Sequence, residues 1–329
     1  MMKALVTGAS GFTGGYLVDN LLKNGYSVRA FVRPSSQIKR FQNLPVELVF
    51  GDLLDADQVN AAVKGVDVVY HLAALYRQAG FPDSVYYDVN VNGTENLLKA
   101  SLTHHIKRFL HCSTGGVHGH VTDPPGDEFS PFNPGDIYQK SKLEGEQLAL
   151  HYFTEYGLPV TIVRPIGIYG PGDTRMLKMY KMVQKGRFIL FGGGDVLYHL
   201  TYVTDTVEGF RLAAENPNSI GEAYILGGKD YTTLAGFAAT IAEVLDVPPP
   251  RFKPPVWPLY GAAWICEKVC IPLRIQPPIF RRRVDIFTKD RAFSIKKAEE
   301  ELGFEPRVSM KEGITKTAQW YKENGLLNE

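Results

Sequence analysis

The sequence predicts an α/β protein in which a doubly wound parallel sheet is joined to a smaller mixed domain. Strand and helix patterns alternate through the first half, which is typical of a parallel sheet with helices on both faces. A glycine-rich turn, GASGFTG at 8–14, joins the first strand to the first helix. After Arg164, glycines and prolines divide the chain into short elements. We therefore expect 1–170 to form the sheet domain and 171–329 to form most of the second domain.

Seven short apolar runs bounded by turn residues are the predicted strands, because buried parallel strands read as near-continuous hydrophobic segments. They lie at 4–7, 27–32, 45–50, 66–71, 108–112, 159–164 and 223–226. Helical patterns occur at 14–24, 57–64, 93–104, 138–152, 296–302 and 311–324. The last strand follows the irregular segment, so we expect the chain to return to the first sheet near 223–228.

The composition excludes several classes of protein. With 36 Lys and Arg against 35 Asp and Glu, the formal charge is +1, and no net field draws the chain to nucleic acid. Hydrophobic residues at 44% and charged residues at 22% exclude a long disordered, collagenous or coiled-coil protein. Three cysteines, Cys112, Cys266 and Cys270, are too few for a disulfide framework, so we expect a reducing, cytoplasmic location.

The most apolar later stretch, 256–270, falls short of the roughly 20 residues that span a bilayer. We therefore expect no membrane span and predict a helix that lines a pocket. Contact of this helix with one face of a membrane is the alternative. Aromatic residues in and after the helix suit a pocket for a ring system or an acyl chain. They are Trp257, Tyr260, Trp264 and Phe280.

The turn at 8–14 has the context of a dinucleotide-binding loop. The strand before it and the helix after it let the glycines bring backbone amides against a pyrophosphate at the positive end of the helix. Its spacing is G-x-x-G-x-x-G, one residue longer between the first two glycines than G-x-G-x-x-G. The expected cofactor contacts of this turn are Gly8, Ser10, Gly11, Phe12, Thr13 and Gly14.

The end of the second predicted strand favours NADP(H), with NAD(H) possible. Arg33 stands there, and no acidic residue occurs between Val28 and Arg40 to bind the ribose hydroxyls. The alternative is that Arg33 is a solvated surface residue. Two later loops fit the adenosine part of the cofactor, through an acceptor for the adenine amino group and small residues that admit close approach. Their expected contacts are Asp52, Leu53, Leu72, Ala73 and Ala74.

Tyr138 and Lys142 stand four residues apart, and therefore on one face of a predicted helix. The ordinary pKa of tyrosine is roughly 10, so acid–base chemistry near neutral pH needs a neighbouring cation that favours the phenolate. Thr114 follows another predicted strand, and ligands of such sheets bind outside the carboxyl ends of the strands. We expect Thr114 to face the same crevice as Tyr138 and to hold a substrate oxygen.

With these residues the chain resembles the extended short-chain dehydrogenases/reductases, a group of Rossmann-type enzymes, over nearly its whole length. The matching segments are GASGFTG at 8–14, GDL at 51–53, HLAA at 71–74, DVNVNGTENLL at 88–98, STGGVHG at 113–119, YQKSK at 138–142, RPIGIYGPGD at 164–173 and TYVTDTVEG at 201–209. The resemblance implies that Thr114, Tyr138 and Lys142 are catalytic, and that Tyr138 and Lys142 also contact the cofactor, the lysine at the nicotinamide ribose. It further implies that Asn90 lies near the cofactor phosphates and Pro165 beside the nicotinamide ring.

The resemblance also implies a substrate-binding role for most of 171–329 and a homodimer. Related proteins pair two helices into a four-helix bundle, and the matching helices here lie near 84–104 and 138–152. In such a dimer Leu143, Leu148 and Leu150 would be buried.

Departures from the group's motifs favour its dihydroflavonol-reductase-like and 3β-hydroxysteroid-dehydrogenase-like branch. Gly115 and Gly116 follow Thr114, where members that dehydrate nucleotide sugars have carboxylates. Tyr198 stands where many nucleotide-sugar members carry an arginine. We therefore predict an NADP(H)-dependent oxidoreductase that interconverts a ketone and a secondary alcohol on a small, largely apolar or ring-containing substrate. The alternatives are a nucleotide-sugar 4-epimerase with tightly bound NAD and a non-catalytic dinucleotide-sensing regulator.

Two further clusters have ordinary explanations. His111, His118 and His120 lack an evident carboxylate partner, so we expect no metal site there. Arg281–Arg283 could grip a phosphate or carboxylate, although a surface cluster at a helix end is the preferred interpretation.

Overall fold

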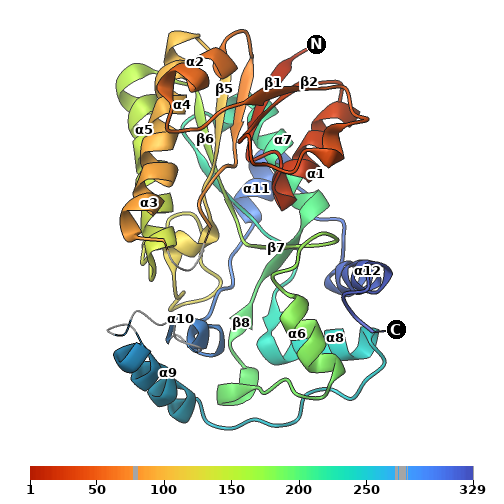
Figure 1. Cartoon of the computed structure of the whole chain (residues 1–329). Coiled ribbons are helices and arrows are strands. Elements are labelled where there is room, and N and C mark those ends of the chain that lie inside the picture. Colours follow the sequence, from red (N-terminus) through yellow and green to blue (C-terminus); the bar gives the residue numbers. More distant parts are fainter. Residues whose placement is uncertain (77–80, 271–272, 274–278, 280, 329) are drawn as a thin grey trace.

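A computed structural model describes residues 1–76, 81–270, 273, 279 and 281–328. Within these residues seven parallel strands form one sheet, in the order β10-β6-β5-β4-β1-β2-β3 (Figure 1). The strands are β1 (Lys3–Thr7), β2 (Ser27–Val32), β3 (Val46–Phe50), β4 (Val68–His71), β5 (Arg108–Cys112), β6 (Val160–Pro165) and β10 (Ala223–Leu226). This order is that of a Rossmann sheet, with one strand added beside β6. The predicted α/β class with a doubly wound sheet is confirmed.

The first strand shows why the sheet is buried on both sides. Ala4 and Val6 belong to the core on one face and Leu5 to the core on the other, and none of the three is exposed. The strand lies between β2 and β4, parallel to both. A strand in this position must be apolar on both faces, which explains the unbroken apolar run in the sequence.

Helices form a layer on each face of the sheet (Figure 1). The layer on the face of Ala4 and Val6 consists of α1 (Phe12–Lys23), α7 (Val203–Glu215) and α11 (Lys296–Leu302). The opposite layer consists of α2 (Ala56–Val63), α4 (Gly93–Thr103) and α5 (Ile137–Tyr156). The loops that follow the strands therefore meet at one edge of the sheet, where ligands of this architecture bind.

A third apolar cluster is the core of the smaller part of the molecule. Its helices are α6 (Leu177–Gln184), α8 (Leu234–Val244) and α12 (Met310–Glu323). Two pairs of short strands lie beside them, β7 (Gly167–Tyr169) with β9 (Leu200–Tyr202) and β8 (Leu197–Tyr198) with β11 (Thr232–Thr233). The remaining helices of the described chain are α3 (Asp83–Tyr87), α9 (Trp257–Cys270) and α10 (Arg281–Val284). No described helix is both long and apolar enough to cross a membrane.

Three helices of the second half, α6, α7 and α8, escaped prediction for physical reasons. The first has Met176 at its N-cap and no side-chain cap, so no capping signal marks its start. The second begins directly after β9 without a side-chain cap, so the sequence carries no capping signal there. The third is apolar on most positions, which weakens the contrast between faces that identifies a helix. The segment 256–270 was predicted as a helix and forms α9.

Candidate active site

The glycine turn closes tightly beneath the first helix. Gly8 has a φ of +71°, which side chains disfavour, and a Cβ there would lie 2.8 Å from the Ala73 nitrogen. A Cβ on Gly14 would overlap the carbonyl oxygen of Gly8. Gly11 begins α1 without a side-chain cap, so the first amides of the helix have no side-chain acceptor. The turn has the form of a cradle for a pyrophosphate, into which a Cβ at Gly8 or Gly14 would intrude.

A cavity of about 520 Å³ lies outside the carboxyl ends of the strands, within the range of small-molecule sites. The predicted site residues that line it are Gly8, Gly11, Phe12, Thr13, Gly14, Leu72, Ala74, Thr114, Tyr138 and Pro165. The predicted site residues outside its lining are Ser10, Arg33, Asp52, Leu53, Ala73, Asn90 and Lys142. The folded chain thus brings the glycine turn and two of the three expected catalytic side chains to one cavity.

Arg33 follows the last residue of β2 and is exposed. Within the described residues no hydrogen bond or ion pair engages its guanidinium. The next arginine along the chain, Arg40, pairs with Asp19 at 2.5 Å and lies over the ring of Tyr16. Among the described residues, Arg40 therefore has an ion-pair partner and Arg33 has none.

The loop after β3 holds the other residues expected near the adenosine. Asp52 is exposed and accepts a hydrogen bond from the Leu54 nitrogen at 3.0 Å. Leu53 is buried, and it packs so closely that a Cβ on Gly93 would lie 3.0 Å from its Cβ. Leu53 therefore contributes to the core that supports the loop.

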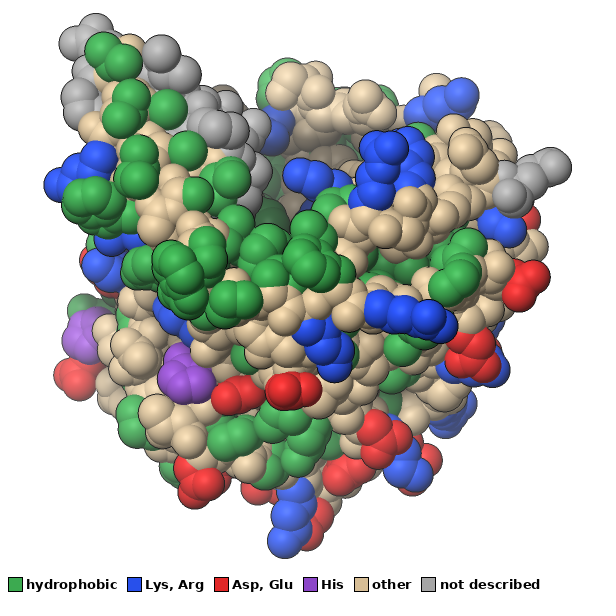
Figure 2. All heavy atoms as spheres, turned by 90° about the horizontal axis from the view of Figure 1, so that it is seen from below, with side chains coloured by type: hydrophobic (Ala, Val, Ile, Leu, Met, Phe, Trp, Pro, Cys, Tyr) green, Lys and Arg blue, Asp and Glu red, His purple; other side chains and the backbone are tan. Residues whose placement is uncertain are grey.

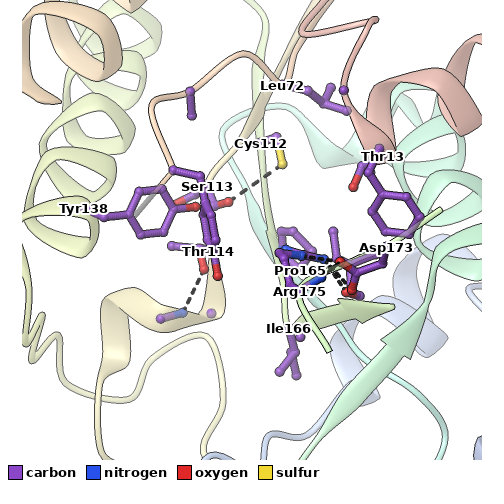
Figure 3. A pocket seen from close by; sticks show the side chains of 18 of the residues that line it. Thr13, Leu72, Cys112, Ser113, Thr114, Tyr138, Pro165, Ile166, Asp173 and Arg175 are labelled. Carbon is purple, nitrogen blue, oxygen red and sulfur yellow. Dashed lines mark hydrogen bonds and ion pairs between the residues drawn. The ribbon is translucent and has the colours of Figure 1, made fainter. Parts of the chain in front are cut away.

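Tyr138 reaches the cavity from the first turn of α5. Asp136 caps this helix by accepting a hydrogen bond from the Gln139 nitrogen at 2.9 Å. Figure 3 shows the ring of Tyr138 directed toward Ser113 and Thr114, which follow β5. The expected acid–base residue and the expected oxygen-binding residue therefore face each other.

Thr114 has an extended backbone, and its Oγ1 accepts a hydrogen bond from the Gly116 nitrogen at 3.1 Å. This bond fixes the side chain and leaves the hydroxyl proton to be donated. The neighbouring Cys112 carries a thiol whose pKa burial raises to about 11, so the thiol stays protonated and is a poor nucleophile. The hydroxyls of Ser113 and Thr114 are therefore the polar side-chain groups that this loop presents to the cavity.

Lys142 lies one helical turn beyond Tyr138 and is only 1% exposed. Its Nζ lies 3.5 Å from His111 Nε2. Burial lowers the pKa of Lys142, because an ammonium group loses hydration in the interior. Burial and the nearby Lys142 hold the pKa of His111 well below its usual range, so this imidazole is neutral. A neutral histidine can accept a hydrogen bond from the lysine.

A buried chain of hydrogen bonds links the glycine turn with the region of Lys142. Thr7 Oγ1 lies 2.8 Å from His71 Nδ1 and accepts from the Ala73 nitrogen at 3.2 Å. His71 Nε2 lies 2.8 Å from Thr94 Oγ1 on α4, and its ring centroid lies 5.4 Å from that of His111. The loop after β4, which packs against Gly8, is therefore fixed by buried hydrogen bonds to Thr7. Through the ring contact of His71 with His111 these bonds connect to the surroundings of Lys142.

Asn90 ties two parts of the site from behind. Its Oδ1 accepts from the Leu75 nitrogen at 2.8 Å, and its Nδ2 donates to Ser141 Oγ at 2.9 Å. It lies in a π-helical turn at Asp88–Asn92, a form of helix that often marks functional sites. Gly145 of α5 approaches this turn so closely that a Cβ on it would lie 2.5 Å from the backbone carbonyl oxygen of Asn90. Asn90 thus joins the loop after β4 to the helix of Tyr138.

The histidines considered as metal ligands have other partners. His118 Nδ1 donates to the Ser130 oxygen at 2.9 Å, and its Nε2 lies 3.3 Å from Arg164, which forms a buried ion pair with Glu146. His120 Nδ1 accepts from the Asp290 nitrogen at 3.0 Å. Among the residues that the structure describes, no three His, Cys, Asp or Glu side chains gather to hold a metal ion.

The wall opposite Tyr138 contains a charged pair that the sequence did not reveal as part of the site. Arg175 Nε donates to Asp173 Oδ1 at 2.7 Å, and both residues line the cavity (Figure 3). The guanidinium also lies over the rings of Phe12 and Tyr76, at 5.7 and 5.5 Å from their centroids. Tyr76 in turn contacts the ring of Tyr138 at 4.9 Å. These contacts span the cavity from the glycine turn to α5, and the motif RPIGIYGPGD pointed only to the neighbourhood of Arg175.

The far end of the cavity combines apolar and polar side chains. Its lining there includes the apolar Ile166, Ile168, Met176 and Phe293 and the polar Tyr198, His199 and Arg291. Burial raises the pKa of Tyr198 to about 12, so its hydroxyl remains protonated near neutral pH. His199 uses both ring nitrogens, since Nε2 donates to the Gly228 oxygen at 2.8 Å and Nδ1 accepts from the Phe293 nitrogen at 3.3 Å. His199 therefore holds the wall together.

The prediction that the helix over 256–270 lines the pocket is wrong. None of the residues of α9 lines this cavity, and Trp257, Tyr260 and Trp264 are exposed to solvent. Phe280 lies outside the described residues. Arg281 is exposed and pairs with Glu267 at 2.6 Å, while the side chains of Arg282 and Arg283 lie outside the described part. The apolar composition of this segment predicted the helix correctly. It did not show which side of the helix is buried and which is exposed to solvent.

Comparison with known proteins assigns the family. The model of the NAD dependent epimerase/dehydratase family matches residues 4–227. The chain belongs to this family. It is 32% identical to the 3 beta-hydroxysteroid dehydrogenase/Delta 5-->4-isomerase of Mycobacterium tuberculosis, over 97% of this chain and 90% of that protein.

Solved structures agree with this assignment. The crystal structure of gox2253 superposes with a TM-score of 0.86 at 32% identity, over the full length of both chains. UDP-glucuronic acid 4-epimerase from Bacillus cereus, in complex with NAD, gives a TM-score of 0.78 at 25% identity, over 98% and 99% of the two chains. The resemblance to extended short-chain dehydrogenases/reductases is confirmed. The protein is an enzyme, an oxidoreductase or epimerase that uses a nicotinamide dinucleotide.

Proposed function

We propose that the protein is an NADP(H)-dependent oxidoreductase that interconverts a ketone and a secondary alcohol on a small, largely apolar or ring-containing substrate. The observation that carries this proposal is the convergence of Thr114 and Tyr138 on the cavity that the glycine turn closes. Hydride would come from, or return to, the bound nicotinamide. The remaining steps belong to side chains of this chain.

In the reducing direction Tyr138 donates its hydroxyl proton to the substrate oxygen, and in the oxidising direction it takes that proton back. Thr114 donates a hydrogen bond to the same oxygen and fixes its position. Lys142, one turn from Tyr138, supplies a positive charge that favours the phenolate and binds ribose hydroxyls. Its burial beside the neutral His111 supports this role, because both the lysine and its imidazole neighbour are held in place by the core.

The cofactor contacts divide between the two ends of the dinucleotide. The turn at 8–14 would hold the pyrophosphate, with Ser10, Phe12 and Thr13 beside it. Asp52, Leu53 and the loop at 72–74 would hold the adenosine. Pro165 would lie beside the nicotinamide, and Asn90 would support the phosphate region by fixing the loop after β4.

We propose NADP(H) over NAD(H) because Arg33 is exposed at the end of β2, where a 2′-phosphate would lie, and no described residue pairs with its guanidinium. Arg33→Asp should reverse the preference, because a charge-assisted contact of about 1.5–3 kcal/mol is lost. Fluorescence titration of both cofactors tests this, with Arg40→Asp as a comparison at an arginine already engaged by Asp19. Equal affinities for the two cofactors in the unmodified protein would contradict the preference.

An apolar, ring-containing substrate is supported by the side chains at the far end of the cavity, among them Ile168, Met176 and Phe293. The relative from Mycobacterium tuberculosis is named for a hydroxysteroid, which is a substrate of this kind. We extend this substrate class to the present chain and propose that most of 171–329 serves to bind it.

The second candidate is a nucleotide-sugar 4-epimerase with tightly bound NAD. The likeness to UDP-glucuronic acid 4-epimerase favours it, whereas Tyr198 and Arg33 weigh against it. An epimerase regenerates its cofactor in every turnover, so purified protein would retain dinucleotide and the absorbance of added NADPH would not change with substrate.

Replacement of the acid–base residue tests the reaction. Tyr138→Phe should lower turnover by about 10²–10⁴-fold and leave cofactor affinity nearly unchanged. Thr114→Ala should also lose rate with little effect on cofactor affinity. Tyr156→Phe, on the exposed end of the same helix, is the control. Wild-type turnover in Tyr138→Phe would contradict the mechanism, and a ligand response without any turnover would support the alternative of a non-catalytic dinucleotide sensor.

We further propose a homodimer formed by α4 and α5, in which the half-buried Leu143, Leu148 and Leu150 become covered. Light scattering that gives a monomer at micromolar concentration would contradict it.

We propose a cytoplasmic location on the ground that Cys112, Cys266 and Cys270 are all unpaired. Cell fractionation tests the location.

A further inference from the structure

The helix α9 presents apolar side chains outward. Surface helices ordinarily turn their apolar stripe to the core and their charged residues to water. Here Ala263 is the buried residue of the helix, while Trp257, Trp264 and Ile265 are 73%, 48% and 56% exposed. The exposed apolar face consists of Trp257, Tyr260, Trp264, Ile265 and Val269. Their spacing places them on one broad side of the helix, together with Lys268.

Figure 2 views the molecule from below the orientation of Figure 1, which is the side on which α9 lies. It shows hydrophobic side chains over one side of this face and across its middle. Phe252, five residues before the helix, and Leu273, three residues after it, are also exposed, at 64% and 62%. An exposed apolar face like that of α9 on a folded protein marks a contact with a partner or a membrane.

The charge of the segment identifies the partner. Seven basic residues and one acidic residue lie between 251 and 283, whereas the rest of the chain contains 29 basic and 34 acidic residues. The one acidic residue, Glu267, is already paired with Arg281 at 2.6 Å. Arg251 and Lys253 precede the helix in the chain, Lys268 lies on it, and all three are exposed. An anionic lipid surface would attract this segment and repel the remainder of the molecule, which fixes the orientation.

The residue types and the length of the helix agree with a position in the plane of the membrane interface. Tryptophan and tyrosine prefer the level of the lipid headgroups, because their rings are apolar and carry one polar group. The helix has 14 residues, so it is about 21 Å long, shorter than the roughly 30 Å of the hydrocarbon core. A helix too short to span the bilayer, with exposed aromatic residues and lysine, can lie along the surface with its apolar face in the headgroup region.

We infer that the apolar face of α9, with the exposed Arg251, Lys253 and Lys268, forms a docking surface for an anionic lipid bilayer. The inference does not depend on the proposed reaction, because α9 contributes no residue to the cavity. Its test therefore uses binding alone.

The test is flotation with vesicles of phosphatidylcholine mixed with phosphatidylglycerol, compared with phosphatidylcholine alone. The chain should bind the mixed vesicles more tightly. Trp257→Ser combined with Trp264→Ser should weaken binding at least about tenfold. Phe50→Ser, at an exposed aromatic residue of the edge strand β3, should leave it unchanged. Lys253→Gln and Lys268→Gln should each weaken binding to the mixed vesicles about fivefold, with no effect on the neutral ones.

Fluorescence gives a second measurement. Trp320→Phe leaves Trp257 and Trp264 as the tryptophans of the chain, so a blue shift of emission on adding mixed vesicles reports entry of α9 into the interface. Thermal melting and cofactor titration check that each variant is folded, and the lysine variants keep the test valid if the double tryptophan variant is not. Absence of binding to the mixed vesicles, or binding that the variants leave unchanged, would overturn the inference. So would self-association without lipid that the tryptophan variant abolishes, because a second copy would then cover α9.

Discussion

The glycine turn and α9 are both glycine-containing and apolar, yet they differ in what surrounds them. In the turn, backbone packs on backbone, so that a Cβ on Gly14 would overlap the oxygen of Gly8. In α9, no described residue outside the helix's own backbone lies within 4 Å of a Cβ placed on Gly261. In the glycine turn, the close packing of the backbone requires glycine at fixed positions. The spacing of glycines in the sequence therefore predicts the structure of the turn. In the second region the pattern predicts a helix, but the side that faces outward depends on what the rest of the fold places beside it.

The largest effect is expected for a residue in the buried part of the molecule, the buried lysine beside the cavity. Lys142→Met should lower turnover by at least about 10²-fold, weaken cofactor binding and move the pH optimum upward, since the phenolate loses its cation. Steady-state rates across pH and a cofactor titration measure the three effects. Lys140→Met, two residues away and exposed, should change none of them. An unchanged pH optimum in Lys142→Met would show that the lysine does not act through Tyr138.

The second prediction concerns the steric closure of the turn. Gly14→Ala should destabilise the protein by about 1–3 kcal/mol, because the added methyl group forces the Gly8 backbone to move. Cofactor affinity should fall as well, since the same movement displaces the amides at the start of α1. Urea unfolding and fluorescence titration measure the two effects. A variant that keeps both would contradict the tight closure of the turn.

The third prediction uses the buried histidines. Burial holds the pKa values of His71 and His111 well below their usual range. Below about pH 6.5 the unfolded chain binds protons that the folded chain does not, so the free energy of unfolding should fall with falling pH, by up to about 1.4 kcal/mol per unit for each histidine. His111→Asn should make this dependence shallower. The measurement is urea unfolding between pH 7.5 and 5.5, roughly the range in which free histidine titrates.

The control for this prediction is His105→Asn. His105 is exposed and has a φ of +49°, a conformation that asparagine tolerates. This variant should keep the pH dependence of the unmodified chain. If His111→Asn and His105→Asn gave the same slope, the buried imidazole would not be the source of the acid sensitivity.

The same contrast explains how far sequence reasoning reached. The doubly wound sheet and the shared cavity of Thr114 and Tyr138 follow from local signals, because strand ends, capping residues and helical spacing lie close together in the chain. Arg175 was missed because its partners Phe12 and Tyr76 are distant in sequence and meet it only in the fold. The outward face of α9 was misjudged for the same reason.

The smallest predicted effect concerns α9. A glycine-to-alanine change there should increase stability, whereas Gly14→Ala should decrease it. Gly261→Ala should stabilise α9 by about 0.5–1 kcal/mol, because alanine restricts the unfolded chain and meets no neighbour in the folded one. Since α9 is attached to the rest of the protein by few contacts, the gain should appear as slower hydrogen exchange of its own amides, with little change in global unfolding. Lysines and aromatic residues are untouched, so binding to anionic vesicles should be kept or strengthened. Faster exchange in the variant would contradict this, because it would show that the added methyl group destabilises the helix.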